Sequence, residues 1–293
     1  MTLITFCLFH VVGGDPAFQL AGKNATIEQI ESIRIELGLN KALSLQYFDF
    51  LKQTVTLDWG RSWSTQQKIS TMIFDGLGPS LSLTIPSFIM SFFICIGIAL
   101  FSTYRKGSWI DRTITTLCLA LMSISFLVYI IFYQYTLAYK AGLFPITGWD
   151  SSFSGRWSYL VLPWIISISV SLGPSILIYR TALLDEVFQD YVRTARAKGV
   201  GNKVIYVKHI LKNALIPIVT IVVMQMPFLI TGSLLLEAFF GIPGLGGMLI
   251  QALNNSDFPV IKTMTVFGSI LYMIFNLLSD LLYAVVDPRV ELK

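Results

Sequence analysis

Asp190-Tyr-Val-Arg-Thr-Ala-Arg-Ala-Lys-Gly199 is the stretch of this chain from which the rest is best interpreted. Apolar side chains in and before it recur at the spacing of one helical face, namely Leu184, Val187, Phe188, Tyr191 and Ala195. Gly199-Val-Gly201 then breaks the helix, because glycine tolerates a left-handed turn. A second helical pattern follows at Val204, Val207, Leu211 and Leu215, and Pro217 is expected to open the next apolar segment. The stretch therefore predicts a helix–turn–helix between two long apolar segments.

The composition identifies the chain as an integral membrane protein. Of its 293 residues, 54% are hydrophobic and only 13% are charged, whereas soluble domains carry about 25% charged residues. The net charge of +4 is modest and lies mostly in short loops, so it indicates membrane orientation and no nucleic-acid partner. Cys7, Cys95 and Cys118 lie in apolar runs without metal or redox spacing. We therefore expect no metal site, no cofactor and no catalytic residue.

Five stretches are long and apolar enough to cross a bilayer as helices: 76–104, 113–139, 157–179, 213–236 and 263–286. The N-terminal stretch 1–13 is apolar too, but at about 1.5 Å per residue it is too short to cross. We interpret it as the second half of a first helix whose start lies upstream. The expectation is an all-α membrane protein with six transmembrane helices, the first of them truncated, forming a single domain over 1–293.

The distribution of Lys and Arg predicts the orientation. The loop 105–112 holds three basic residues, and 180–212 holds seven against three acids. The opposite short loops hold only Lys140, Arg156 and Lys262. The basic loops, including the 180–213 loop, and the C-terminus with Arg289 and Lys293 are therefore expected in the cytoplasm. The polar segment 14–75 is then external.

The external segment carries its own helix signals. Thr26-Ile-Glu-Gln29 has the pattern of a capping box. Ile27, Ile30, Ile33 and Leu37 follow at roughly helical spacing, and Gly38 is a suitable stop. An aromatic patch at 47–51 comes next. Short amphipathic helices here could lie on the membrane or form a lip over a pore. We expect them to pack against the neighbouring spans in preference to contacting a ligand.

The outer end of the fifth predicted span carries the second group of candidate residues. Glu237 ends this span, and it is either an ordinary interfacial acid or a gate or contact to a binding protein. The glycine-rich run 241–247 lacks the Lys and Ser/Thr of a nucleotide-binding loop. It is expected to form a tight turn at the outer mouth. The candidate pore or outer-mouth residues are Glu237, Pro243, Gly244 and Gly246. Asp280, inside the last span, is expected to form a structural ion pair.

The stretch 191–199 resembles the cytoplasmic coupling loop of ABC-importer permeases, in the wording of the dipeptide/oligopeptide/nickel family. Ala195 and Gly199 match the alanine and glycine of that motif, while Arg193 replaces its acidic residue and Pro217 comes late. Both departures are usual in this branch. Further segments resemble the same family: 14–16, 58–62, 105–112, 162–163, 240–246, 257–259 and 280–289. The long external segment resembles that of the B-type subunit.

The resemblance implies the fold of a type I ABC-importer permease in the bacterial cytoplasmic (inner) membrane. It implies coupling to ATPases through Asp190, Tyr191, Arg193, Ala195, Arg196, Lys198 and Gly199. The implied partners are a second permease subunit, two ATP-binding subunits and an extracytoplasmic substrate-binding protein. The implied cargo is di- or oligopeptides, with nickel or another small solute as the alternative. Because the chain has no nucleotide-binding loop, ATP hydrolysis is expected on partner chains.

Two other classes of protein fit less well. A secondary transporter would place ionisable residues and broken helices at mid-membrane, and the sequence has no central ionisable pair. A membrane-embedded enzyme would need a convergent catalytic set, and no such set is evident.

Overall fold

The computed structural model describes residues 2–11, 16–21, 26–36 and 38–286, and in these ranges the regular elements are helices. Apart from them there is one isolated β-bridge, between Arg61 and Lys68. The N-terminal helices are α1 (Thr2–Val11), α2 (Pro16–Ala21), α3 (Ile27–Glu36) and α4 (Leu43–Thr56). The central ones are α5 (Ile69–Tyr104), α6 (Trp109–Met122), α7 (Phe126–Tyr133), η1 (Gln134–Lys140) and α8 (Phe153–Val187). The remainder are α9 (Asp190–Ala197), α10 (Asn202–Val204), η2 (Ile205–Ile210), α11 (Leu211–Thr231), α12 (Leu234–Phe240), α13 (Leu245–Asn254) and α14 (Phe258–Val286).

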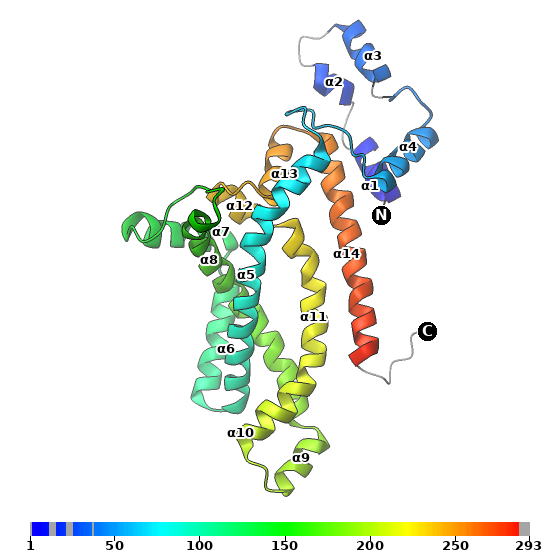
Figure 1. The fold of residues 1–293 in the computed structure, drawn as a ribbon. Coiled ribbons are helices and arrows are strands. Elements are labelled where there is room, and N and C mark those ends of the chain that lie inside the picture. The colour runs from blue at the N-terminus through cyan, green and yellow to red at the C-terminus, as the bar shows by residue number, and fades with distance from the viewer. Residues whose placement is uncertain (1, 12–15, 22–25, 37, 287–293) are drawn as a thin grey trace.

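The long helices form one bundle with a different set of short helices at each end (Figure 1). α5 packs along α8, α6 packs on α8, and α11 lies between α5 and α14. The helices α1 to α4, α12 and α13 gather at one end of the bundle, whereas α9 and α10 lie at the other. The two candidate regions are therefore at opposite ends.

Four described helices are long and apolar enough to cross a membrane: Ile69–Tyr104, Gly155–Val187, Asn202–Phe240 and Phe258–Leu281. They contain four of the predicted spans nearly or entirely. The fold is all-helical in the described ranges, as expected for a membrane bundle. Helix α1 has ten residues, and residues 1, 12 and 13 of the predicted first helix lie outside the described ranges.

The predicted span 113–139 differs from the expectation of one continuous helix. It consists of Trp109–Met122 and Phe126–Lys140, which are bent by 94° at the break between them. Ser123 follows the first helix and donates its hydroxyl to Leu119 O at 3.0 Å, while Ser125 precedes the second with extended backbone. Serine hydroxyls compete with helical hydrogen bonds, and these two flank the break.

The capping box in the external segment is confirmed. The Thr26 backbone N–H donates to Gln29 Oε1 at 3.0 Å, and Gln29 N–H donates to Thr26 Oγ1 at 3.4 Å. Gly38 has a φ of +66°, as the predicted stop requires. Leu37, Gly14 and Asp15 of the predicted motifs lie outside the described residues, as do residues 287–293 with Arg289 and Lys293.

Candidate functional site

Helix α9 packs one apolar face onto the end of the bundle. Val192 is fully buried and Ala195 is 8% exposed. Both belong to a core cluster that also contains Leu183 of α8, Ile210 of η2 and Ala99 of α5. Val192 and Ala195 thus connect α9 to a core cluster shared by residues of α5, α8 and η2.

The turn after α9 depends on Gly199. Its φ is +75°, a conformation that costs a residue with a side chain free energy. Gly199 N–H donates to Arg196 O at 3.0 Å, and Val200 N–H donates to Ala195 O at 3.2 Å, closing the helix. A Cβ added to Gly199 would meet no atom within 4 Å. Glycine is needed here for its backbone conformation and not for space.

The outward face of α9 carries charges that are free to bind a partner. The side chains of Asp190 and Arg193 are 93% and 74% exposed, with 3.4 Å between Asp190 Oδ1 and Arg193 Nη1. Such exposed pairs contribute only about 0–1 kcal/mol, so the guanidinium is readily released to another carboxylate. Arg196 and Lys198 are also exposed. Arg193 and Arg196 on α9 and Lys198 at its C-cap are therefore all accessible.

Tyr191 joins α9 to the end of α8. Its hydroxyl donates to Glu186 Oε2 at 2.6 Å. Burial and this hydrogen bond to the carboxylate raise the pKa of Tyr191 to about 12, so the phenol keeps its proton and its donor role at neutral pH. The contact fixes the direction in which α9 leaves α8.

The helix after the turn is continuous with the following long helix. It runs from α10 through the π-helical η2 into α11, and the Tyr206 ring meets the edge of Tyr104 at 5.2 Å between centroids. Pro217 lies inside α11, so the expectation that it opens this span is wrong. The helix continues past Pro217, which removes one helical hydrogen bond, and the nearby Ala214 and Ile218 are fully buried in the core.

An ion pair that the sequence analysis missed lies at the same end of the bundle. Asp111 accepts from Arg180 Nε and Nη2 at 2.9 Å each, from Ser102 Oγ at 2.6 Å and from Gly107 N–H at 3.0 Å. It therefore joins α5, α6 and α8. One feature of the sequence points to this ion pair: Asp111 is the only acid in the basic loop 105–112.

Glu237 lies at the opposite end and is only 1% exposed. Its Oε1 accepts from Ser80 Oγ at 2.8 Å and Ser233 N–H at 3.1 Å, and its Oε2 accepts from Gly247 N–H at 3.0 Å. Ser80 Oγ also accepts from Leu245 N–H at 2.8 Å. The carboxylate is a buried acceptor that joins α5, α12 and α13, with no open aqueous face.

The glycines beside Glu237 allow close packing. A Cβ on Gly244 would lie 2.4 Å from Glu237 Oε2 and 2.5 Å from Ser80 Oγ. A Cβ on Gly246 would lie 2.8 Å from Leu234 N. Pro243 is exposed. The structure thus places three of the four outer-mouth candidates in or beside one buried hydrogen-bonded cluster, with Pro243 on its surface.

Asp257 connects two motifs that lie far apart in the sequence. It accepts from Ser62 Oγ at 2.5 Å, from Ser64 Oγ at 2.8 Å, and from the N–H groups of Trp63 and Ser64 at 3.1 Å each. Burial alone would raise the pKa of Asp257, but these hydrogen bonds outweigh it and lower the pKa below its ordinary value. The segment after 58–62 is held in this way against the start of α14.

Asp280 is exposed on α14 and has no ion-pair partner in the part of the chain that the structure describes. Within the same ranges, no group of three His, Cys, Asp or Glu side chains could hold a metal ion.

Comparison with known proteins gives consistent matches over the whole chain. A family model described as "binding-protein-dependent transport system inner membrane component" matches residues 94–292, and the model of the N-terminal part of such proteins matches residues 1–84. The chain is 30% identical to the dipeptide transport system permease protein of Alkalihalophilus pseudofirmus, covering 99% of this chain and 94% of the relative. It is 30% identical to a glutathione transport system permease protein of Shigella flexneri, covering 100% and 94%. It is 34% identical to a putative peptide transport system permease protein of Brucella abortus, covering 99% and 94%.

Proposed function

This chain belongs to the family of binding-protein-dependent transport system inner membrane components, and from that membership we propose that it is a permease subunit importing di- or oligopeptides. It forms half of the translocation pore and pairs with a second, similar permease. Two ATPase subunits bind at the α9 end, and a substrate-binding protein delivers cargo at the other. The peptide cargo is supported by the names of relatives, which are dipeptide, peptide and glutathione transport permeases.

The observation that carries this proposal is the two-sided construction of α9. Arg193 and Arg196 of α9 and Lys198 at its C-cap are exposed, and these cations suit an acidic groove on an ATPase. Its buried face, through Val192 and Ala195, packs on η2 and shares one core cluster with residues of α5 and α8. Closure of the ATPases on ATP displaces α9, and α9 displaces the long helices. Because ATP-bound ATPases bind one arrangement of the bundle better than the other, the pore changes state.

We place the α9 end and the C-terminus in the cytoplasm and the Glu237 end outside. This orientation is supported by the basic loops 105–112 and 180–213, which both lie at the α9 end (Figure 1). The membrane is the bacterial cytoplasmic membrane.

The proposal is tested by uptake into proteoliposomes that contain this chain with its co-expressed partner subunits. We expect ATP-dependent accumulation of a labelled dipeptide in the presence of the binding protein. Accumulation of Ni²⁺ without the dipeptide would replace peptide by nickel as cargo. Dipeptide uptake that proceeds equally well without ATP would contradict the assignment to an ATP-driven importer.

A further inference from the structure

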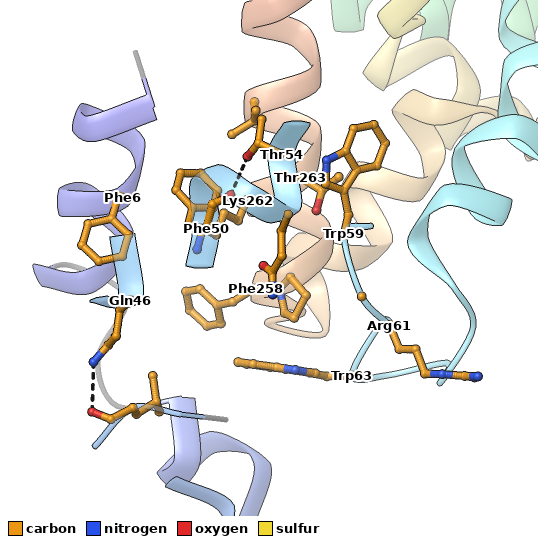
Figure 2. A pocket seen from close by; sticks show the side chains of 15 residues that line it. Phe6, Gln46, Phe50, Thr54, Trp59, Arg61, Trp63, Phe258, Lys262 and Thr263 are labelled. Carbon is orange, nitrogen blue, oxygen red and sulfur yellow. Dashed lines mark hydrogen bonds between the residues drawn. The ribbon is translucent and has the colours of Figure 1, made fainter. Parts of the chain in front are cut away.

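A cavity of about 340 Å³ lies where the N-terminal helices meet the start of α14 (Figure 2). Its walls include the aromatic rings of Phe6, Phe50, Trp63 and Phe258. The volume is within the range of small-molecule sites, which are mostly apolar with a few polar groups. The cavity is at the end of the bundle opposite α9 and is not part of the hydrogen-bonded cluster around Glu237.

Lys262 brings a positive charge to this cavity without a carboxylate partner. Its Nζ lies 3.9 Å from the centroid of the Phe50 ring and 5.6 Å from that of Phe6. No Asp or Glu is within ion-pair distance among the residues that the structure describes. Aromatic faces stabilise an ammonium group, but they do not accept its hydrogen bonds as a carboxylate would.

Trp59 contributes its indole ring to the wall of the same cavity. Its Nε1 is closed off by neighbouring atoms and makes no hydrogen bond within the described part of the molecule. A ligand in the cavity therefore meets the ring of Trp59 and not its N–H. Among the described residues, Lys262 Nζ is the donor of this cavity that lacks an acceptor.

The remaining lining determines the sign of the charge and the character of the ligand. Among the described residues of the cavity wall, Arg61 is the other charged one, and none is Asp or Glu. The Arg61 guanidinium donates to Gln66 O at 2.8 Å and extends away from Lys262 (Figure 2). The ammonium group of Lys262 is therefore the charge that favours an anionic ligand over a cationic one. The aromatic walls favour an apolar body attached to that anion.

We propose that this cavity binds a small carboxylate that carries an apolar side chain. The carboxylate accepts from Lys262 Nζ, and the side chain lies against Phe6, Phe50 and Phe258. The C-terminal residue of a short peptide has this chemistry, so the cavity would hold cargo at the outer mouth. That last step rests on the proposed function, whereas carboxylate binding does not.

The test is calorimetric titration of the whole transporter, in nanodiscs of zwitterionic lipid and without ATP. The two probes are N-acetyl-phenylalanine and its C-terminal amide, which differ only in the negative charge. We expect saturable binding of the acid and at least tenfold weaker binding of the amide. Equal binding of both probes, or binding of neither, would overturn the proposal.

Variants locate the site. Lys262→Met is expected to weaken binding of the acid at least tenfold, and Lys262→Arg much less. Phe258→Ala, which removes an aromatic wall of the cavity, is expected to weaken it severalfold. Lys140→Met removes an exposed lysine outside the cavity wall and should leave binding unchanged. Thermal unfolding reports whether each variant folds, and Phe258→Ala still tests the site if Lys262→Met does not fold. Unchanged affinity in the folded Lys262 and Phe258 variants would contradict the proposal.

The outcome is independent of the proposed function. Binding of the acid by a preparation that shows no ATP-driven uptake would leave this inference intact and contradict the importer. Uptake of dipeptide without any binding that depends on Lys262 and Phe258 would contradict this inference and leave the importer intact.

Discussion

Ser80 Oγ donates to Glu237 Oε1 at 2.8 Å, although 157 residues separate the two in the sequence. The same serine oxygen accepts from Leu245 N–H, so one hydroxyl and one carboxylate hold α5, α12 and α13 together. A buried carboxylate is tolerated only when donors surround it, and Glu237 has two backbone N–H groups in addition to Ser80.

Replacing Glu237 by alanine should destabilise the protein strongly. The change leaves Ser80 Oγ–H and the N–H groups of Ser233 and Gly247 without their acceptor, and an unsatisfied buried donor costs about 1–3 kcal/mol. Glu237→Gln should cost less, because its amide oxygen still accepts. Thermal unfolding in detergent measures both, with the exposed Glu28→Ala as the matched control. Equal unfolding temperatures for Glu237→Ala and Glu28→Ala would contradict the account.

Two glycine-to-alanine changes should have opposite consequences. A Cβ at Gly244 would lie 2.4 Å from Glu237 Oε2, whereas a Cβ at Gly78 would meet nothing within 4 Å. Gly244→Ala is expected to cost about 1–3 kcal/mol through overpacking. Gly78→Ala, inside α5, is expected to be neutral or stabilising by up to about 1 kcal/mol. The unfolding temperatures of the two variants measure both effects. An unchanged unfolding temperature for Gly244→Ala would contradict the overpacking and show that the backbone at Gly244 can move away from Glu237.

The Asp257 contacts should fail in acid. Because hydrogen bonds lower the pKa of Asp257 in the folded state, its stabilisation is fully present above the unfolded pKa of about 3.9 and is lost as pH falls through the folded pKa. The unfolding temperature of the wild type should therefore decline more steeply below about pH 4 than that of Asp257→Asn. Asp75→Asn, an exposed control, should follow the wild type. Parallel pH profiles for wild type and Asp257→Asn would be inconsistent with this account.

The Arg180–Asp111 pair should show strong coupling. The side chains are 19% and 6% exposed, and removing one partner of a buried pair costs about 3–5 kcal/mol because the other charge remains. Arg180→Met should therefore be more damaging than Arg180→Met combined with Asp111→Asn. A double-mutant cycle on unfolding free energies measures the coupling. Additive effects would mean that the two groups do not interact in solution.

Local patterns in the sequence predicted the features that depend on neighbouring residues. The capping box at Thr26, the left-handed turn at Gly199 and the apolar face of α9 each follow from residues within one or two helical turns. The Ser80–Glu237, Asp111–Arg180 and Asp257–Ser62 contacts join residues 157, 69 and 195 positions apart. No periodicity specifies such partners. The break near Ser123 and Ser125 was hidden by the apolar composition on both sides of it.

The central claim is that α9 is the surface on which an ATPase binds, and co-purification in mild detergent tests it most directly. The wild-type chain should bring down an ATPase and a second permease. Arg193→Glu reverses an exposed charge on α9, and it should retain the second permease while losing most of the ATPase. Lys140→Glu, the matched reversal at the far end of the molecule, should retain both. Undiminished ATPase recovery with Arg193→Glu, or a wild-type chain that purifies without any ATPase, would contradict the account.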